Sequence, residues 1–437
     1  MQNMKINDKN QEWIGNIPKN WTFKKIKYVL AQRNEKNIPI KSKDILSLTA
    51  KQGVIPYTEK EGGGNKPKTD FSAYKLAYPG DIVMNSMNIL SGAVGLSKYF
   101  GCVSPVYYML YCSNDEDDIR YFYYVFANKA FQSSLLGIGN GILMKESENG
   151  TFNTIRMRIP IEKLNNMSIP YPKPEIQKAI ANFLDKKIGK IDEVSKKIQQ
   201  EITDLEKYRK SIITKAVTTG LNKNIQMKDS NIDYINKMPS TWHLTRLKYI
   251  LTERNQRSID GKEMLLSVSQ KKGVLPAYQV KRSIKANSLV GYKIVKQNDL
   301  VFNKLNPALA RFGVSNYNGI TSPDFSVYYS NKINIQFLSF LLKTSKYVTE
   351  YKRLCSGVGE GYTRLYTPTL YNIKVALPTI KEQNKIVNIL NKKDQKIKKL
   401  MEKQKRLLLT LTQYKQSLIY EYVTGKKQVS SKESAKA

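Results

Sequence analysis

Two long stretches of the chain repeat hydrophobic residues at the spacing of an amphipathic helix. The first runs from Glu175 to Thr219 with Gly189 as its only glycine or proline, and the second follows Pro378. Alternating steps of three and four residues are typical of the a and d positions of a coiled coil. We therefore predict that two helices pack on each other through Ile191, Val194, Ile198, Leu205, Tyr208 and Ile212 of the first and Ile397, Leu400, Leu407, Leu411, Tyr414 and Leu418 of the second. Each helix would extend roughly 65 Å at 1.5 Å per residue. The alternative is that each helix lies lengthwise on its own domain.

The segments before each helix have a different pattern. They mix short β-rich runs, such as Asp81 to Asn85 after a Pro-Gly turn and Pro105 to Tyr111, with glycine, asparagine and proline. Such runs between turn residues favour an α+β domain with long loops.

The two halves of the chain repeat one another. The segment Ile17 to Asn34 recurs as Lys237 to Asn255, with Trp21 matching Trp242 at an offset of 242 − 21 = 221. Later matches keep the same order: Gly53 with Gly273, Pro56 with Pro276, Gly80 to Asn85 with Asn298 to Asn303, Gly95 to Pro105 with Gly313 to Pro323, Tyr208 with Tyr414, and Gly220 with Gly425 at an offset of 205. A repeat of this kind predicts two similar structural units. We expect a first α+β domain at 1–173, a central helix at 174–220, a second domain at 221–379, a C-terminal helix at 380–425 and a flexible basic tail at 426–437.

The charge of the chain indicates a polyanionic partner. It has 72 Lys and Arg against 36 Asp and Glu, a formal net charge of +36. Solubility alone does not require such an excess, so nucleic acid is the leading candidate. Hydrophobic residues make up 41% of the chain, which is enough to form cores.

The small number and the spacing of the cysteine and histidine residues exclude several classes of site. Cys102, Cys112 and Cys355 are scattered without CxxC spacing, and His243 is the only histidine. A disulfide framework, a structural zinc site and a histidine-dependent triad are therefore not expected. No stretch approaches the roughly 18 apolar residues of a membrane span, so we expect a cytoplasmic protein.

The short motifs that are typical of enzymes are incomplete or absent in this sequence. Gly137 to Gly141 (GIGNG) and its counterpart Gly357 to Gly361 (GVGEG) lack the strand, helix and acidic residue of a dinucleotide-binding site, and GxxxxGK[ST] is missing from the sequence. Asn306-Pro307 lacks the aromatic continuation of amino-methyltransferase motifs, and Glu350-Tyr351-Lys352 is a triplet that any chain this charged contains by chance. His243 is interpreted as a packing or surface residue. No catalytic residue and no metal ligand is predicted.

The remaining pattern favours DNA binding. Lysine, arginine, asparagine and glutamine in loops can neutralise phosphates and contact base edges. The candidates are Lys51, Gln52, Lys66, Lys68, Asn85 and Asn88 in the first copy, and Gln270, Lys271, Lys272, Asn303, Lys304, Asn306, Arg311, Tyr362 and Arg364 in the second. For any one of them, a solvated loop side chain is the alternative.

These features together resemble the specificity subunit of Type I restriction-modification systems, the HsdS family. Each half opens with a Pro-x-x-Trp element, at Pro18 to Trp21 and at Pro239 to Trp242. Each ends with a hydrophobic-Pro pair and a glutamine at the helix start: Ile169-Pro170 with Gln177, and Leu377-Pro378 with Gln383. The second copy keeps the Glu-Gln typical of the family, whereas the first reads Glu175-Ile176-Gln177. The resemblance covers nearly the whole chain.

The resemblance implies a non-catalytic protein with two target recognition domains, related by a pseudo-twofold axis and joined by an antiparallel coiled coil. Each domain would read one half of a bipartite site in double-stranded DNA. The implied partners are two methyltransferase subunits and restriction subunits that translocate or cleave DNA. S-adenosylmethionine, ATP and Mg²⁺ would belong to those partners, with no cofactor in this chain.

Two other functions stay open. A self-sufficient DNA-modifying enzyme with an unrecognised motif would methylate or cleave DNA without partners. A coiled-coil assembly protein that binds RNA would show no preference for a specific duplex.

Overall fold

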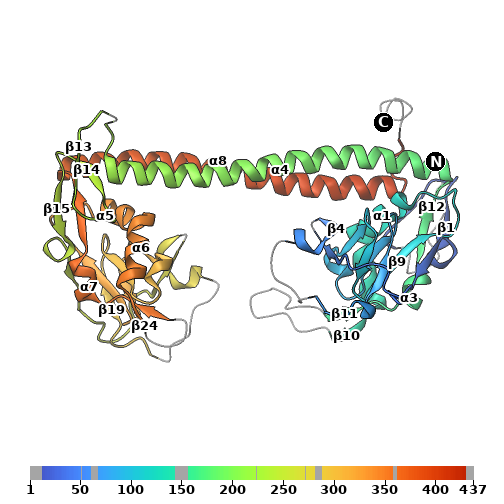
Figure 1. Ribbon diagram of the computed structural model, residues 1–437, viewed down its shortest axis with the longest axis horizontal. Coiled ribbons are helices and arrows are strands. Elements are labelled where there is room, and N and C mark those ends of the chain that lie inside the picture. Colours follow the sequence, from blue (N-terminus) through green and yellow to red (C-terminus); the bar gives the residue numbers. More distant parts are fainter. Residues whose placement is uncertain are drawn as a thin grey trace. The chain divides into compact units, whose positions relative to one another are not determined.

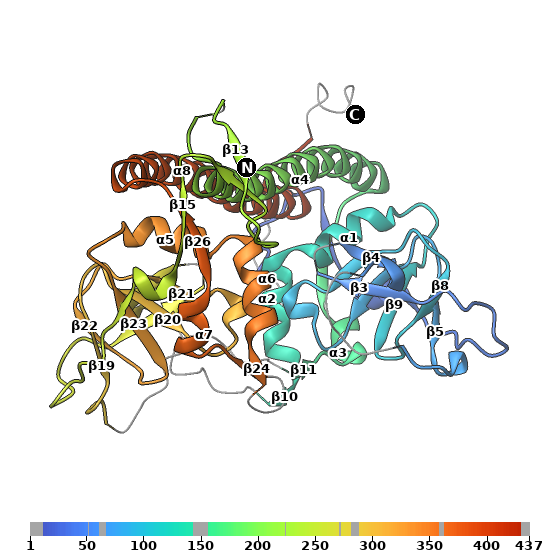
Figure 2. The same cartoon turned by 60° about the vertical axis from the view of Figure 1, so that its left-hand side comes forward.

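The computed structural model describes residues 12–50, 52–60, 67–142, 156–222, 224–270, 272–280, 288–357 and 362–429. It divides into two compact units (Figures 1 and 2). Unit 1 comprises Met1–Gln199 with Arg406–Ala437, and unit 2 comprises Gln200–Lys405. This division differs from the one expected along the sequence, because each unit takes one domain and a part of both long helices.

The two units repeat the same order of strands and helices, apart from one additional strand pair at the start of unit 2. Unit 1 contains β1 (Thr22–Lys25), η2 (Ile26–Tyr28), β2 (Leu30–Arg33), β3 (Leu46–Thr49), β4 (Gly53–Pro56), β5 (Lys75–Ala77), β6 (Ile82–Asn85), β7 (Val94–Leu96), β8 (Gly101–Val103), β9 (Tyr107–Cys112), α1 (Ile119–Ala127), α2 (Lys129–Ser134), β10 (Asn140–Ile142), β11 (Arg156–Arg158), α3 (Ile161–Asn165) and β12 (Ser168–Tyr171). Unit 2 contains β13 (Met227–Asp229), β14 (Lys237–Pro239), β15 (His243–Arg246), η7 (Leu247–Tyr249), β16 (Thr252–Glu253), β17 (Leu266–Ser269), β18 (Gly273–Pro276), β19 (Lys293–Val295), β20 (Leu300–Asn303), β21 (Phe312–Val314), β22 (Gly319–Thr321), β23 (Phe325–Tyr329), α5 (Ile335–Leu342), α6 (Ser345–Leu354), β24 (Ser356–Gly357), β25 (Thr363–Arg364), α7 (Thr367–Asn372) and β26 (Lys374–Leu377). The long helices are α4 (Pro174–Thr219) and α8 (Ile380–Val423).

Each unit has a four-stranded antiparallel sheet at its centre. Its strand order is β2-β9-β6-β7 in unit 1 and β16-β23-β20-β21 in unit 2. Four two-stranded pairs also correspond between the units: β1-β12 with β15-β26, β3-β4 with β17-β18, β5-β8 with β19-β22, and β10-β11 with β24-β25. The predicted α+β class with two similar domains is thereby confirmed.

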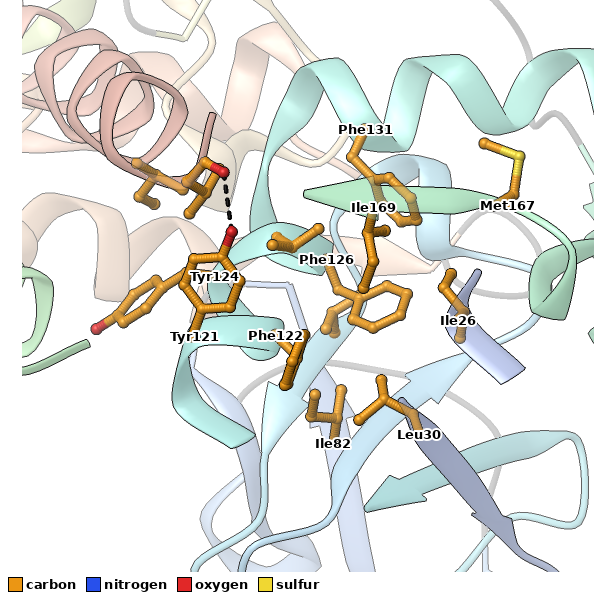
Figure 3. Close-up of a cluster of buried hydrophobic side chains, with 14 of the residues drawn as sticks. Ile26, Leu30, Ile82, Tyr121, Phe122, Tyr124, Phe126, Phe131, Met167 and Ile169 are labelled. Carbon is orange, nitrogen blue, oxygen red and sulfur yellow. Dashed lines mark hydrogen bonds between the residues drawn. The ribbon is translucent and has the colours of Figure 1, made fainter. Parts of the chain in front are cut away.

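The core of unit 1 joins its domain to both long helices. Trp21 is 2% exposed, and its ring meets that of Tyr121 of α1 edge to face, with centroids 6.5 Å apart. The hydroxyl of Tyr121 donates to the carbonyl oxygen of Val423 at 3.1 Å (Figure 3). It also lies 3.1 Å from the carbonyl oxygen of Pro170. Phe183 of α4 and Tyr422 of α8 lie with ring centroids 4.4 Å apart.

Unit 2 has a matching core around Trp242, which is 1% exposed. It includes Ala216 and Val217 from the end of α4 and Ile386 and Leu390 from the start of α8. The indole N–H of Trp242 lies 3.4 Å from Oε1 of Glu382. The two tryptophans that the repeat pairs are therefore equivalent core residues.

Within each unit α4 and α8 are antiparallel. In unit 1, Asp192 of α4 pairs with Lys415 of α8 at 2.7 Å. In unit 2, Gln404 of α8 donates to Glu201 of α4 at 2.7 Å, and Arg209 pairs with Asp394. Higher numbers in α4 thus meet lower numbers in α8, as a coiled coil of antiparallel helices requires.

The residues that lie between α4 and α8 differ in part from the predicted ones. Val194 and Tyr208 are 45% and 54% exposed, and Leu400, Leu407 and Tyr414 are 43%, 43% and 51% exposed. The less exposed faces instead follow Ile188, Ile191, Ser195, Ile198, Ile202, Leu205, Arg209 and Ile212 in α4 and Ile397, Met401, Gln404, Leu408, Leu411, Lys415 and Leu418 in α8. Both rows keep steps of three and four residues. Seven of the twelve predicted residues lie on these faces: Ile191, Ile198, Leu205, Ile212, Ile397, Leu411 and Leu418. At the other five positions the next residue in the chain is the less exposed one: Ser195, Arg209, Met401, Leu408 and Lys415.

A glycine ends each long helix region in the left-handed conformation. Gly220 has φ +76° and Gly425 has φ +70°. A Cβ at Gly425 would lie 2.4 Å from Cδ of Pro18, so both the backbone conformation and the packing require glycine there. In the part of the chain that the structure describes, neither of these helices nor any other is apolar enough over sufficient length to span a membrane.

Candidate nucleic-acid interface

In each unit a loop and a β-hairpin meet at one end of the central sheet. Strand β6 ends at Asn85 and β20 ends at Asn303, and a loop follows each. The N–H of Ile159, just after β11, donates to the carbonyl of Ser86 at 3.0 Å. The N–H of Leu365, just after β25, donates to the carbonyl of Lys304 at 3.1 Å. We name residues 85–93 and 303–311 the reading loops, each held by an equivalent backbone bond.

The side chain of the first residue of each reading loop accepts a hydrogen bond from the backbone of the same loop and so stabilises a turn. Oδ1 of Asn85 accepts the N–H of Met87 at 3.0 Å, and Oδ1 of Asn303 accepts the N–H of Leu305 at 2.9 Å. Both side chains are half-buried. This turn is a structural role for two residues that the sequence suggested as base contacts.

Asn306 ties its reading loop to the hairpin of unit 2. It has φ +49°, its N–H donates to the carbonyl of Thr363 at 2.8 Å, and its Oδ1 accepts the N–H of Thr363 at 3.0 Å. The corresponding Asn88 of unit 1 is exposed and has φ −125°. Equivalent asparagines thus have different conformations in the two loops.

Lys304 and Arg364 form the basic part of the unit 2 site. Arg364 lies on β25 with its guanidinium 3.7 Å from Asp324 and 5.6 Å from the ring centroid of Tyr366. Burial lowers the pKa of Lys304, and the nearby charges of Lys293 and Arg364 lower it further. Two neighbouring cations favour an anionic ligand such as a phosphate. Tyr362, beside them, is 58% exposed.

A second hairpin approaches the reading loop from the side. A Cβ at Gly95, just after the first loop, would lie 2.8 Å from the N atom of Val54 in β4. In unit 2 a Cβ at Gly313 would lie 3.2 Å from Cα of Gly273 in β18. Glycine at these positions therefore permits the hairpins β3-β4 and β17-β18 to approach β7 and β21, the strands that follow the reading loops. The candidates on these turns, Gln52, Gln270 and Lys272, are exposed.

The other candidates are placed as follows. Arg311 ends its reading loop and is exposed. Lys68 is exposed on a separate segment, where its N–H donates to the hydroxyl of Tyr74 at 2.7 Å. Lys51, Lys66 and Lys271 lie outside the described residues.

The sequence reasoning missed Arg158. It is exposed at the end of β11, one residue before Ile159, just as Arg364 stands one residue before Leu365. Burial and the nearby charge of Arg158 lower the pKa of Lys75. Extending the repeat through residues 158 and 364, at the offset that joins Gln177 to Gln383, would have identified it.

The discarded motifs have structural roles. Gly137 and Ile138 belong to a short 3-10 helix (Leu135–Ile138) and Asn140 begins β10, while Gly357 ends β24 and the rest of the second run lies outside the described residues. His243 is an exposed residue that begins β15. Glu350 forms an ion pair with Arg353 at 2.6 Å.

Two buried glutamines join the domains to the helix starts. Nε2 of Gln177 donates to Asp117 at 2.8 Å and to the carbonyl of Pro172, and its Oε1 accepts the N–H of Asp118. Gln383 repeats this with the carbonyl of Pro378 at 2.9 Å and the N–H of Asn334 at 2.9 Å. The glutamine of each helix start therefore fixes the helix to its own domain.

Comparisons with known proteins agree on one family. The family described as Type I restriction modification DNA specificity domain matches residues 18–204 and 239–410. The Type I restriction enzyme MjaVIII specificity subunit of Methanocaldococcus jannaschii is 26% identical over 271 residues, which are 56% of this chain and 62% of that relative. The chain therefore matches less than two thirds of that relative's length.

One solved structure shows the same fold, and a second aligns with a lower TM-score. A chain solved to explain complex assembly and conformational transition of the type I R-M system aligns with a TM-score of 0.65 at 12% identity, over 94% of this chain and 99% of that chain. The HsdS subunit from Thermoanaerobacter tengcongensis aligns with a TM-score of 0.49 at 13% identity, over 94% and 98% of the two chains.

Proposed function

The chain belongs to the family of Type I restriction-modification specificity subunits, and on this premise we propose that it reads a bipartite sequence in double-stranded DNA, one half through each unit. The observation that supports this most directly is the repeated arrangement of reading loop and hairpin. The two loops are held by the same backbone bond but carry different side chains, Ser86 and Met87 in one and Lys304 and Leu305 in the other. A common scaffold with different loops suits two different half-sites.

The proposed DNA contacts are the candidates named from the sequence, together with Arg158. Lysine and arginine side chains neutralise phosphates, while amides and arginines contact base edges. The contacts proposed are Lys51, Gln52, Lys66, Lys68, Asn85, Asn88 and Arg158 in unit 1 and Gln270, Lys271, Lys272, Asn303, Lys304, Asn306, Arg311, Tyr362 and Arg364 in unit 2.

The proposed partners are two methyltransferase subunits and the restriction subunits of the same system. The large side chains that α4 and α8 leave exposed in each unit are suited to docking these subunits, because exposed apolar side chains mark interaction sites. They are Val194, Tyr208, Leu400, Leu407 and Tyr414. The chain itself is non-catalytic, and S-adenosylmethionine, ATP and Mg²⁺ belong to its partners.

Sequencing of the methylated DNA motif tests whether each unit reads one half-site. The chain is expressed with its cognate methyltransferase subunit, and Gln270, Lys271, Lys272 and the loop 303–311 are replaced by those of another specificity subunit. Only one half of the methylated motif should change, since each lost bidentate base contact costs roughly 1 to 3 kcal/mol of discrimination. A change in both halves would contradict the proposal.

A self-sufficient enzyme is the second candidate. It requires the purified chain to bind S-adenosylmethionine and to methylate or cleave DNA without partners. We expect neither, and stoichiometric cofactor binding measured by calorimetry would overturn that expectation.

A further inference from the structure

Each unit exposes a tyrosine beside a lysine at the same point of its fold. Tyr28 ends η2 and is 67% exposed, and Tyr249 ends η7 and is 57% exposed. Nζ of Lys27 lies 5.2 Å from the ring centroid of Tyr28, and Nζ of Lys248 lies 4.9 Å from that of Tyr249. We name residues 25–28 and 246–249 the Lys-Tyr corners.

The backbone of both corners is fixed in the same way. Ile26 and Leu247 are fully buried, and their N–H groups donate to the carbonyls of Met167 and Ile373, each at 3.0 Å. The residue before each buried side chain is basic and exposed, Lys25 in one unit and Arg246 in the other. Each corner therefore presents one aromatic ring and two cations from an anchored turn.

Packing does not account for these tyrosines. A ring that is more than half exposed adds little to a core, whereas tyrosine is enriched at protein interfaces. The reading loops differ between the units, yet the corners keep the order basic, buried, lysine, tyrosine. A feature kept on two otherwise different surfaces suits a partner that is identical for both.

The corners lie at the end of the sheet away from the reading loops. In unit 1, Cys112 of β9 pairs with Leu30, two residues after the corner, while Tyr107 pairs with Asn85 at the reading loop. Those five steps along β9 span roughly 17 Å at 3.4 Å per residue. In unit 2, Tyr329 of β23 pairs with Thr252 near the corner and Phe325 pairs with Asn303. This separation favours a protein over the DNA that the loops contact.

We propose that both Lys-Tyr corners bind the same acidic surface on a protein subunit that joins the complex in two copies. The tyrosine ring packs into that surface and the two cations pair with its carboxylates. The inference rests on the proposed function, which supplies two identical methyltransferase subunits as the partner.

The test compares the intact chain with corner variants in binding its purified cognate methyltransferase subunit, with stoichiometry measured by native mass spectrometry. Tyr28→Ala with Lys27→Glu should weaken binding of one of the two copies at least tenfold, and Tyr249→Ala with Lys248→Glu should do the same for the other. The four changes together should weaken both. Tyr278→Ala is the matched control, because Tyr278 is 80% exposed but has Thr58 at the position paired with it by the repeat.

The outcomes separate this inference from the proposed function. Corner variants that fold normally and still bind two methyltransferase subunits with unchanged affinity would overturn it. A second outcome would also overturn the inference: the corner variants assemble normally, but without partners they bind all DNA sequences more weakly. The corners would then contact the DNA phosphate backbone. If the unmodified chain binds no methyltransferase subunit, the proposed function itself fails.

Discussion

Arg209 of α4 pairs with Asp394 of α8 at positions where a coiled coil ordinarily places apolar side chains. The two side chains are 33% and 14% exposed, and Lys398 also pairs with Asp394, at 2.8 Å. Burial raises the pKa of Asp394, but hydrogen bonds from Arg209 and Lys398 outweigh it and hold the pKa below its ordinary value. The pair fixes which residues of the two helices face each other, because a shift along the helix would leave Asp394 without Arg209.

Replacing Arg209 with Ala should therefore destabilise unit 2. We expect a loss of about 1 kcal/mol in the free energy of unfolding, because the ion pair is only partly buried and Lys398 remains beside Asp394. Denaturant unfolding at pH 7 measures it. Because the pKa of Asp394 is lowered in the folded chain, this stabilisation is present above its unfolded pKa and is lost as pH falls through the folded value. The variant should therefore lose less stability than the parent chain on acidification below about pH 4.

Much of the fold could be predicted from the sequence, because the paired motifs of the repeat mark equivalent positions in the two units. Trp21 and Trp242 are equivalent core residues, and Gly220 and Gly425 end α4 and α8, as the paired motifs suggested. The exact helix face could not be predicted in the same way. Apolar spacing alone placed Tyr208 at the contact, whereas the less exposed neighbouring residue is Arg209, whose carboxylate partner lies 185 residues away in the chain.

The sequence predicted the region of the candidate site, but it did not predict the structural role of each residue in it. Charge and loop composition brought together Lys304, Asn306 and Arg364, which the structure joins through the bonds between reading loop and hairpin. The turn made by the Asn303 side chain has no signal in composition, because asparagine serves equally in turns and in base recognition. Arg158 has no signal of its own in composition, because it ends the three-residue strand β11 outside the repeated motifs and is identified only by its equivalence to Arg364.

Ala310 lies in a backbone conformation that favours glycine. It has φ +48°, whereas Gly92 of the first reading loop has φ +84°. Ala310→Gly should raise the free energy of unfolding by about 0.5 kcal/mol, since relief of the left-handed strain exceeds the lost packing of one methyl group. The converse change, Gly92→Ala, should lower it by about 1 kcal/mol. Denaturant titration of both variants checks this, and destabilisation by Ala310→Gly would show that the methyl group matters more.

Lys343 should destabilise unit 2 at neutral pH. Burial, followed by the nearby charges of Arg209 and Lys398, lowers its pKa from 10.5 to about 8. Lys343→Met keeps a long side chain against Phe312 and removes the charge, so we expect a gain of about 1 to 3 kcal/mol at pH 7. Between pH 8 and 10.5 the unfolded chain binds the extra proton, so this residue makes the parent's stability rise with pH. The variant should lack that rise in thermal melts, and equal slopes for both proteins would contradict the assignment.

The length of α4 and α8 should set the unread spacer between the two half-sites. Residues 174–199 of α4 belong to unit 1 and residues 200–219 to unit 2, so one continuous helix joins the two. Seven residues inserted after Lys197 and seven at the facing part of α8, after Gln404, preserve the steps of three and four. They lengthen each helix by about 10 Å at 1.5 Å per residue, which is close to three base pairs at 3.4 Å each. Sequencing of the methylated motif should then show both half-sites unchanged and a spacer longer by about three base pairs. Four residues inserted after Lys197 alone form the control, because they turn the seam away from α8 and should abolish methylation or reduce the shift to two base pairs or fewer. An unchanged spacer in the double insertion would show that the helices do not determine the distance between half-sites.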